Sequence, residues 1–265
     1  MLTLLDRAIA GRRVHIVATE RSDGDVHPER VAPDLLRARQ RAITGTSWTM
    51  LDQVHGTDLV DVRADDRRSP QPSRAGRSMQ SDQTMQSMRT MQPVPAVESE
   101  QVPPLAGVGD VLRTDDVGTS LAVWAGDCAT IFLVSDDGRL VGAHGGWRGL
   151  AAGIVDVAVD ALDGASVVAA VLGPVIHPCC YEFDERDRRA VEAGVGVVDG
   201  ALRSTTTDGR QALDVPAAVT AALGRRGVTL DVVGPCTGCD RRWFSHRIRR
   251  DTGRHATIAT MDVLA

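Results

Sequence analysis

The sequence contains no lysine: all 30 basic residues in this chain of 265 are arginine. A compositional bias of the genome is the simplest explanation, although arginine also favours forked, bidentate contacts wherever an anion binds. The 35 acidic residues bring the formal net charge to -5. Because non-specific binding of nucleic acid depends on an excess of positive charge, we expect no nucleic-acid partner.

Other features are also missing. No apolar run is long enough to span a bilayer, and the N-terminus lacks the charged-then-apolar order of a secretion signal. The 5 cysteines are an odd number and do not form the disulfide framework of a small secreted domain. Neither a dinucleotide-binding Gly-x-Gly-x-x-Gly nor a Walker motif occurs. We expect a cytoplasmic protein, monomeric or a small homo-oligomer, without a membrane partner.

Residues 64–104 differ from the rest of the chain, because they are rich in Ser, Gln, Met, Arg and Pro and poor in large aliphatic residues. Such a segment cannot bury enough apolar surface to offset the entropy of ordering it. We therefore interpret it as a disordered insertion. No second core is evident, so residues 1–265 are expected to form a single domain.

The apolar periodicity predicts strands alternating with helices after residue 120, and hairpin-like strand pairs before it. The predicted class is α/β of a mixed α+β type, with helices packed on a layered, mixed β-sheet. Helices are expected at 33–43, 150–162, 185–193 and 215–223. Strands are expected at 13–19, 47–55, 59–62, 119–125, 167–172 and 228–233, with a turn joining the second and third.

The most informative stretch runs from Trp124 to Ala152. It begins with Gly-Asp-Cys and continues with two apolar runs that an Asp-Asp-Gly turn separates. It then reaches His-Gly-Gly-Trp-Arg-Gly and an Ala-rich segment. This pattern predicts a strand, a turn, a strand, a glycine-rich loop and a helix. Potential metal ligands thus stand where the predicted strands begin and end.

His55, Cys128 and His144 are the candidate metal ligands. Two imidazoles and a thiolate suit Zn²⁺, and three protein ligands leave a fourth position for water or substrate, as in catalytic zinc sites. Spacing alone leaves other interpretations open, because a buried cysteine is often a small hydrophobe and a histidine at a strand end is often only hydrogen-bonded. Cys128 between two histidines could instead be a nucleophile, a role that excludes metal ligation in the same state.

Asp127 is a candidate catalytic residue together with Cys128 and His144. It could orient a histidine or act as a general acid or base. Adjacent residues of a strand point to opposite faces, so Asp127 reaches the site only if the chain bends there. The alternative is a turn or capping residue.

Arginines supply a candidate anion site. Arg148 stands where a helix is expected to begin, and the free N–H groups and dipole of a helix N-terminus favour negative charge. Arg247 and Arg254 belong to an arginine-rich C-terminal segment, and two such side chains could hold a phosphate in bidentate fashion. We interpret the neighbouring Arg249 and Arg250 as a solvated basic face.

The remaining cysteines form a vicinal pair, Cys179 and Cys180, and a C-x₂-C pair, Cys236 and Cys239. Four thiols could bind one zinc ion, but vicinal cysteines rarely present both sulfurs to the same ion. We therefore interpret all four as buried structural thiols near the wall of the site.

Five stretches resemble one known family in the right order: 53–56, 126–128, 144–149, 173–182 and 244–254. The family was once named for multicopper polyphenol oxidases, or laccase domains. Its bacterial members are described as zinc-dependent purine nucleoside phosphorylases and adenosine deaminases, or as peptidoglycan editing factors. The resemblance implies a YfiH-like, cysteine-hydrolase-type fold.

The resemblance also implies roles for individual residues. His55, Cys128 and His144 would be the zinc ligands, and Asp110 stands in the position of a recurrent aspartate. Substrate- or phosphate-binding residues would be Arg148, Arg254, Arg247, Arg21 and Gln53. The chain departs from the family pattern at 245–248, where the family has an aromatic residue and paired arginines, and at the insertion 64–104.

The implied function is a zinc-dependent enzyme of purine nucleosides, acting by phosphorolysis with phosphate or by deamination of adenosine. One alternative is a cytoplasmic hydrolase that edits peptidoglycan precursors. Another is a copper-dependent polyphenol oxidase, but a four-copper enzyme needs many histidines in His-x-His pairs, and this chain has 7 histidines and no such pair. A binding protein merely stabilised by its metal would need a fourth ligand.

Overall fold

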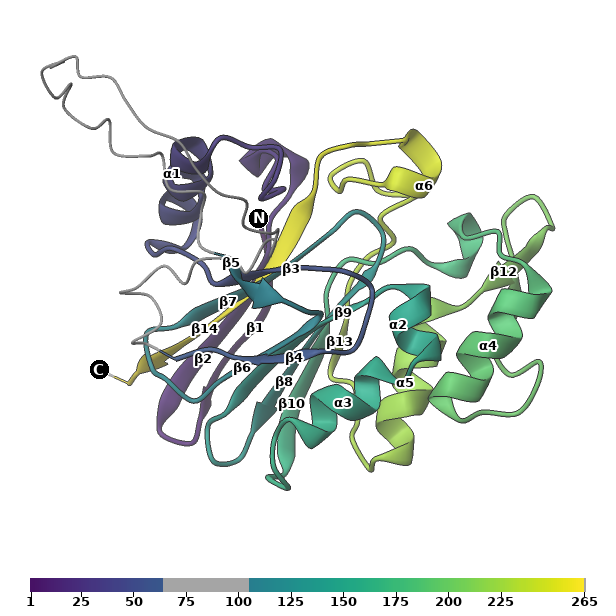
Figure 1. The fold of residues 1–265 in the computed structure, drawn as a ribbon. Coiled ribbons are helices and arrows are strands. Elements are labelled where there is room, and N and C mark those ends of the chain that lie inside the picture. The colour runs from purple at the N-terminus through teal and green to yellow at the C-terminus, as the bar shows by residue number, and fades with distance from the viewer. Residues whose placement is uncertain (64–104, 265) are drawn as a thin grey trace, which may run out of the picture.

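Two β-sheets packed face to face form the centre of the fold (Figure 1). The computed structural model describes residues 1–63 and 105–264, so the predicted insertion at 64–104 lies outside the described residues. The four-stranded sheet is antiparallel throughout. Its strands, in spatial order, are β1 (Leu2–Ile9), β2 (Arg12–Ala18), β14 (His255–Val263) and β7 (Ser120–Ala125).

The second sheet has six strands and is mixed, as predicted. In spatial order they are β13 (Val232–Val233), β10 (Val167–Leu172), β8 (Ala129–Ser135), β9 (Leu140–Gly145), β6 (Val111–Thr114) and β4 (Leu59–Asp61). The two outermost strands run parallel to their neighbours, and the inner pairs are antiparallel. Two short pairs stand apart: β3 (Met50–Asp52) with β5 (Leu105–Val108), and β11 (Arg203–Thr205) with β12 (Gln211–Leu213).

Strand β8 shows why the centre of this sheet is apolar on both faces. Phe132 and Val134 belong to the core between the two sheets, whereas Ile131 and Leu133 belong to the core beneath the helices. Successive side chains of a strand alternate between faces. A strand covered on both sides therefore reads as a continuous apolar run.

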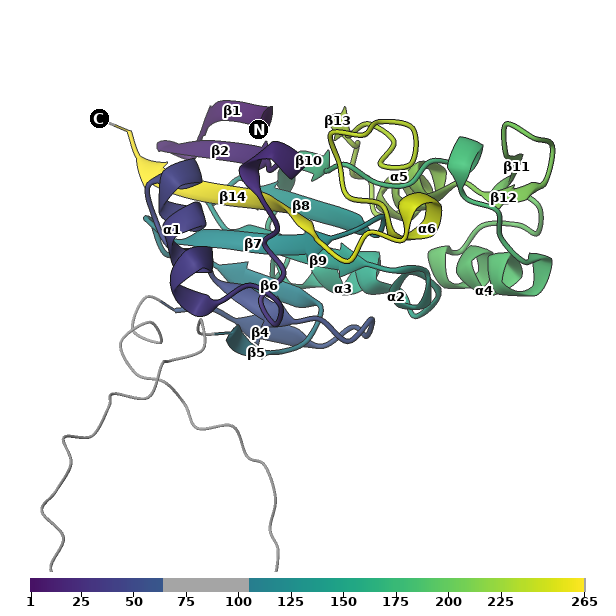
Figure 2. The same ribbon diagram turned by 90° about the horizontal axis from the view of Figure 1, so that it is seen from above.

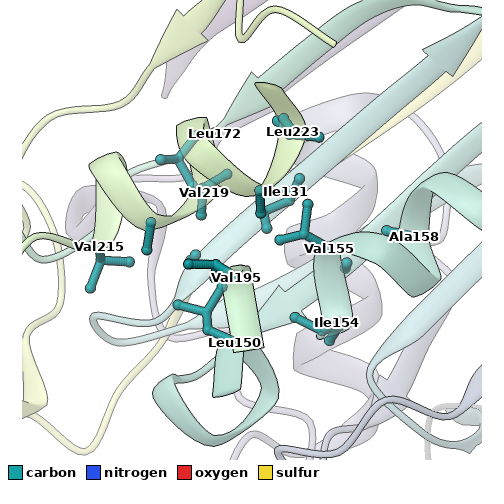
Figure 3. Close-up of a cluster of buried hydrophobic side chains, with 14 of the residues drawn as sticks. Ile131, Leu150, Ile154, Val155, Ala158, Leu172, Val195, Val215, Val219 and Leu223 are labelled. Atoms are coloured by element: carbon teal, nitrogen blue, oxygen red, sulfur yellow. The ribbon is translucent and has the colours of Figure 1, made fainter. Parts of the chain in front are cut away.

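Helices cover the outer faces of both sheets. The group on the six-stranded sheet comprises α2 (Trp147–Ala151), α3 (Ile154–Asp160), α4 (Glu185–Val195) and α5 (Val215–Arg225). Figure 3 shows side chains such as Leu150, Val155 and Leu223 meeting in this core. Helix α1 (Pro33–Thr44) buries Leu36 on the four-stranded sheet, well apart from that group (Figure 2). The layers are thus helix, sheet, sheet and helices.

Short elements complete the fold: the 3-10 turns η1 (Arg21–Asp23) and η3 (Pro178–Cys180), and the helix α6 (His246–Arg249). In the described part of the chain, no helix is long and apolar enough to cross a membrane.

Three predictions about individual elements are wrong. The helix expected at 150–162 is two helices, because Gly153 between α2 and α3 has a left-handed φ of 83°. The strands expected at 47–55 and 59–62 do not pair as a hairpin; β3 pairs with β5, and β4 pairs with β6. The strand expected at 228–233 is reduced to the two residues of β13. For the strands, pairing with a partner distant in the sequence, rather than the local pattern, sets the limits of the element.

Candidate metal centre

The three predicted metal ligands come together in space. His55 follows β3, Cys128 directly precedes β8, and His144 lies near the end of β9. Because β8 and β9 are antiparallel neighbours, the beginning of one lies beside the end of the other. One ligand atom from each of the three residues lies within 4.8 Å of the other two. His144 is buried, Cys128 is half-buried and His55 is exposed, so the group is accessible on the side of His55.

Asp110 fixes the orientation of His144. Its Oδ1 lies 2.8 Å from Nδ1 of His144, and the carboxylate accepts the N–H groups of Val54, His55 and Gly56 at 3.2, 3.0 and 2.6 Å. A carboxylate at Nδ1 requires the ring proton there, which leaves Nε2 free for a metal. Burial raises the pKa of Asp110, but the hydrogen bonds from His144 and Gly56 outweigh burial, and the net pKa is lowered.

The backbone of His55 and a glycine opposite it bring the two imidazoles together. His55 has a left-handed φ of 62°, and its N–H is one of those that Asp110 accepts. A Cβ on Gly146 would stand 2.5 Å from Cδ2 of His55, closer than side chains approach. The glycine after β9 therefore makes room for the ring, whose centroid lies 4.9 Å from that of His144.

Cys128 and His144 shift each other's pKa when no metal ion is bound. Burial by itself would raise the pKa of Cys128, but the charge and hydrogen bond of His144, with help from His55, lower it to about 6. Burial by itself would lower the pKa of His144, but the Cys128 thiolate and Asp110 raise it to about 9. Between these values the pair is a thiolate and an imidazolium. A metal cation can take the place of the imidazolium proton as the partner of the thiolate.

The chain does bend at Asp127, where φ is 119°. Its carboxylate, however, has partners outside the ligand group: Oδ1 accepts the hydroxyl of Thr237 at 2.6 Å, and Oδ2 accepts the N–H of Arg247 at 2.7 Å. Burial raises the pKa of Asp127, and these hydrogen bonds offset only part of that effect. Asp127, which directly precedes Cys128 in the sequence, thus holds the segment that carries Arg247.

Two residues predicted to bind substrate are engaged within the protein. Arg21 forms an ion pair with Asp251, and its guanidinium carbon lies 4.4 Å from the ring centroid of Phe244. The side-chain amide of Gln53 donates to the carbonyl of Trp124 at 2.8 Å and accepts its N–H at 3.1 Å. Gln53 therefore ties the loop before His55 to the end of β7.

The guanidinium groups of the other three predicted arginines have no carboxylate partner within the described residues. Arg148 is the second residue of the short helix α2, and its guanidinium lies over Trp147 at 4.4 Å. Arg247 lies over the ring of Tyr181 at 4.8 Å. The guanidinium of Arg254 donates to nearby main-chain carbonyls. Their positive charges remain available for an anion.

Sequence reasoning gave no role to two residues beside the centre. Asp110 orients His144, and its only signal was its place in the resemblance. His27 is buried, with its ring centroid 4.7 Å from that of Trp124, whose own ring stacks on His144 at 6.4 Å. An isolated His or Asp carries no local pattern, so only the tertiary contacts show what these two residues do.

The prediction that the four remaining cysteines are buried thiols that do not meet at one position is wrong. The sulfurs of Cys179, Cys180, Cys236 and Cys239 all lie within 4.8 Å of one another, although the first two are vicinal. They are also less buried than predicted, because Cys239 is exposed and the vicinal pair is half-buried. Arg249, predicted to be solvated, donates to two carbonyls of the C-x₂-C turn at 2.8 and 2.9 Å.

The sequence matches the family of multi-copper polyphenol oxidoreductase laccases over residues 17–262. Among its relatives, the purine nucleoside phosphorylase YlmD of Geobacillus stearothermophilus is 32% identical over 215 residues, which cover 77% of this chain and 68% of the relative. A purine nucleoside phosphorylase of Streptomyces coelicolor is 38% identical over 234 residues, 86% of this chain and 80% of the relative.

Solved structures confirm the predicted fold class. The crystal structure of YlmD from Geobacillus stearothermophilus superimposes with a TM-score of 0.70 and 22% identity, over 96% of this chain and 93% of that one. The hypothetical protein YfiH of Bacillus licheniformis gives a TM-score of 0.67 and 21% identity, over 95% and 96%. At such identities the likeness concerns the fold alone.

Proposed function

We propose, because the chain belongs to the multi-copper polyphenol oxidoreductase laccase family, that it is a zinc-dependent enzyme of purine nucleosides. The reaction would be phosphorolysis of adenosine, inosine or guanosine-type nucleosides, deamination of adenosine, or both. The convergence of His55, Cys128 and His144 within 4.8 Å carries the proposal. The names of the relatives supply the substrate class.

The donor set favours a single zinc ion over several coppers. One thiolate and two imidazoles are ligands that zinc accepts, and a set of three is typical of catalytic zinc. All 7 histidines of the chain lie within the described residues, and only His55 and His144 belong to the ligand group. Too few histidines remain for the several copper sites of a laccase.

Different residues of the chain would hold the metal ion and bind the phosphate. Zinc, when bound, supplies Lewis acidity and can lower the pKa of water towards neutrality. Asp110, hydrogen-bonded to Nδ1 of His144, would leave Nε2 of that ring to hold the ion. Arg148, Arg247 and Arg254 offer guanidinium groups that can grip phosphate in bidentate fashion and hold it at the sugar.

In phosphorolysis, a phosphate oxygen forms a bond to C1′ of the ribose while the bond from C1′ to the purine nitrogen breaks. The departing base takes up a proton. In deamination, the oxygen of water adds to C6 of adenine and ammonia leaves with a further proton. Asp127 is our candidate for these proton transfers, because burial raises its pKa above that of an ordinary aspartate.

One observation favours a second candidate, the cytoplasmic hydrolase of peptidoglycan precursors. Without metal, Cys128 and His144 form a thiolate–imidazolium pair, which is the state of an activated cysteine nucleophile. Cys128 would then attack the scissile carbonyl, and His144 would protonate the leaving group. The two functions differ in their need for zinc.

The test is turnover of inosine and adenosine by protein of known metal content, with and without phosphate. We expect phosphate-dependent release of base at about one zinc in the three-ligand site, and loss of turnover in His144→Ala. The matched control is His15→Ala, a histidine of β2 outside the ligand group. Full activity after removal of zinc would overturn the proposed need for zinc, and no turnover with zinc present would favour the cysteine hydrolase. Activity on phenols with copper alone would favour the oxidase.

A further inference from the structure

We propose that Cys179, Cys180, Cys236 and Cys239 form a second, structural metal site that binds a single zinc ion. The closest sulfur pairs are Cys180 with Cys239 at 3.3 Å and Cys179 with Cys239 at 3.4 Å. Cys179 also lies 3.7 Å from Cys236 and 3.8 Å from Cys180. All four sulfurs lie within 4.8 Å of one another. This group, here called the four-cysteine site, shares no residue with the His55–Cys128–His144 group.

These sulfur–sulfur distances match the tetrahedral coordination of a single metal ion. With Zn–S bonds of about 2.3 Å, the sulfurs of a tetrahedral zinc site stand about 3.8 Å apart. A disulfide needs about 2.05 Å, far less than any of the observed sulfur separations. A set of four thiolates selects zinc or iron over the hard cations, and sulfurs this close together suit one ion better than a cluster of several.

The local backbone brings the vicinal pair to the same point. Cys179 and Cys180 lie in the 3-10 turn η3, where successive side chains diverge by about a third of a turn. Their sulfurs nevertheless lie 3.8 Å apart, and so flank one position from two sides. On the other loop, a Cβ on Gly238 would stand 2.7 Å from Sγ of Cys180. The glycine inside the C-x₂-C turn thus leaves the space into which that sulfur fits.

The surroundings also suit a thiolate. The N–H of His177 lies 3.4 Å from Sγ of Cys236, and the N–H groups of Gly238 and Cys239 also point to this sulfur. Hydrogen bonds to the charged form stabilise it. Four donors from the protein would fill the coordination of a zinc ion, and such closed sites are structural.

A metal here would join two loops that form a wall of the candidate active site. Ile176, in the loop of the vicinal pair, donates to the carbonyl of Asp127 at 3.0 Å. Thr237, between the cysteines of the other loop, donates to the carboxylate of Asp127 at 2.6 Å. Asp127 adjoins Cys128. The four-cysteine site would therefore hold Asp127 in place without contacting substrate.

The test is metal analysis of the full chain, purified under reducing conditions. We expect about two zinc ions per chain, with about one lost in Cys239→Ser and about one lost in the matched variant His55→Ala. Cys239 is the residue of choice because it is exposed. Cys239→His should restore the lost zinc, because imidazole is also a zinc ligand. An unchanged zinc content in Cys239→Ser would overturn the proposal.

A second readout covers the case in which Cys239→Ser does not fold. Wild-type chain loaded with Co²⁺ should show the visible absorption of cobalt bound by four thiolates, and this absorption should persist in His55→Ala. Its absence in the loaded wild type, or a disulfide between these cysteines in the reduced protein, would overturn the proposal. Neither readout depends on the substrate, so failure here leaves the proposed nucleoside activity untouched.

Discussion

The five cysteines of this chain lie in two regions, one with a single cysteine and one with four, and the two regions are built differently. In the first, Cys128 meets two imidazoles that come from separate parts of the sequence, and the carboxylate of Asp110 holds one of them. In the second, all donors are sulfur and come from two short loops. The first has three donors and an outer carboxylate; the second has four donors and main-chain N–H groups around them.

The difference indicates a catalytic role for the first region and a structural role for the second. A three-donor group keeps one coordination position exchangeable, which catalysis requires, whereas a four-donor group is closed and contributes to folding. The supporting contacts agree, because Asp110 controls the direction of one imidazole, while the four-cysteine site connects two loops. The following predictions test whether the two regions are as separate as this comparison implies.

The largest effect is expected from Cys128→Ala. Removing the one sulfur of the first region should abolish its zinc binding and lower nucleoside turnover by more than the roughly 10–100-fold that loss of an outer orienting group costs. Cys239→Ser should cause a smaller loss, since it acts only through the position of Asp127. Initial rates with inosine, normalised to folded protein, compare the two. Normal turnover in Cys128→Ala would contradict the role of the first region.

Asp110→Asn should have the next largest effect. The neutral amide cannot accept from His144 and three main-chain N–H groups as a carboxylate does, so zinc affinity at the first region should fall by about 10–100-fold. Zinc in the four-cysteine site should be unaffected. In competition with a chelator, the zinc of the first region should then be released more readily than in the wild type, and the release of the zinc of the four-cysteine site should be unchanged. A loss of both zinc ions together would mean that the two regions are coupled.

The third prediction concerns pH in zinc-stripped protein. The pKa of Cys128 is lowered to about 6, so its alkylation rate should rise as pH increases through 6. Burial and the neighbouring sulfurs raise the pKa of Cys179 to about 12, so this thiol should stay unreactive at neutral pH. Peptide mapping distinguishes the two. In His144→Ala the midpoint for Cys128 should move upward; an unchanged midpoint would remove His144 as the cause.

The same pair predicts how the stability of the zinc-stripped chain depends on pH. The folded pKa of Cys128 lies below its ordinary value, so its contribution is lost as pH falls through about 6. The folded pKa of His144 lies above its ordinary value, so its contribution is lost as pH rises through about 9. Between these values one contribution grows as the other declines, so the stability from this pair should change little there, as thermal unfolding against pH would show.

The smallest effects are expected from three glycine substitutions. Gly146→Ala places a Cβ against His55, and Gly238→Ala places one against Cys180, so each should weaken zinc binding in its own region and cost about 1–3 kcal/mol. Gly224→Ala is the control, because its Cβ would meet nothing within 4 Å. It should be neutral or stabilise α5 by up to about 1 kcal/mol. Metal analysis and thermal unfolding measure both effects.

Much of the secondary structure could be predicted, but its pairing could not. The apolar runs of β8 and β9, the turn between them and the start of α2 follow the local pattern of hydrophobicity and glycine. Strand β4 pairs with β6, which follows residues 64–104 in the sequence, rather than with its neighbour β3. No local pattern specifies that choice, because it depends on which apolar faces meet in the assembled sheets.

The sequence by itself determined the order of the elements and the chemical nature of the donors, since periodicity and residue type are local properties. Only the tertiary structure decided which donors meet. His144 lies 34 residues from Asp110, and Cys179 lies 57 residues from Cys236, so both contacts depend on how distant strands and loops pack. The sulfurs of the vicinal cysteines lie 3.8 Å apart in a 3-10 turn, and Gly238 of a distant loop leaves the space that the sulfur of Cys180 fills.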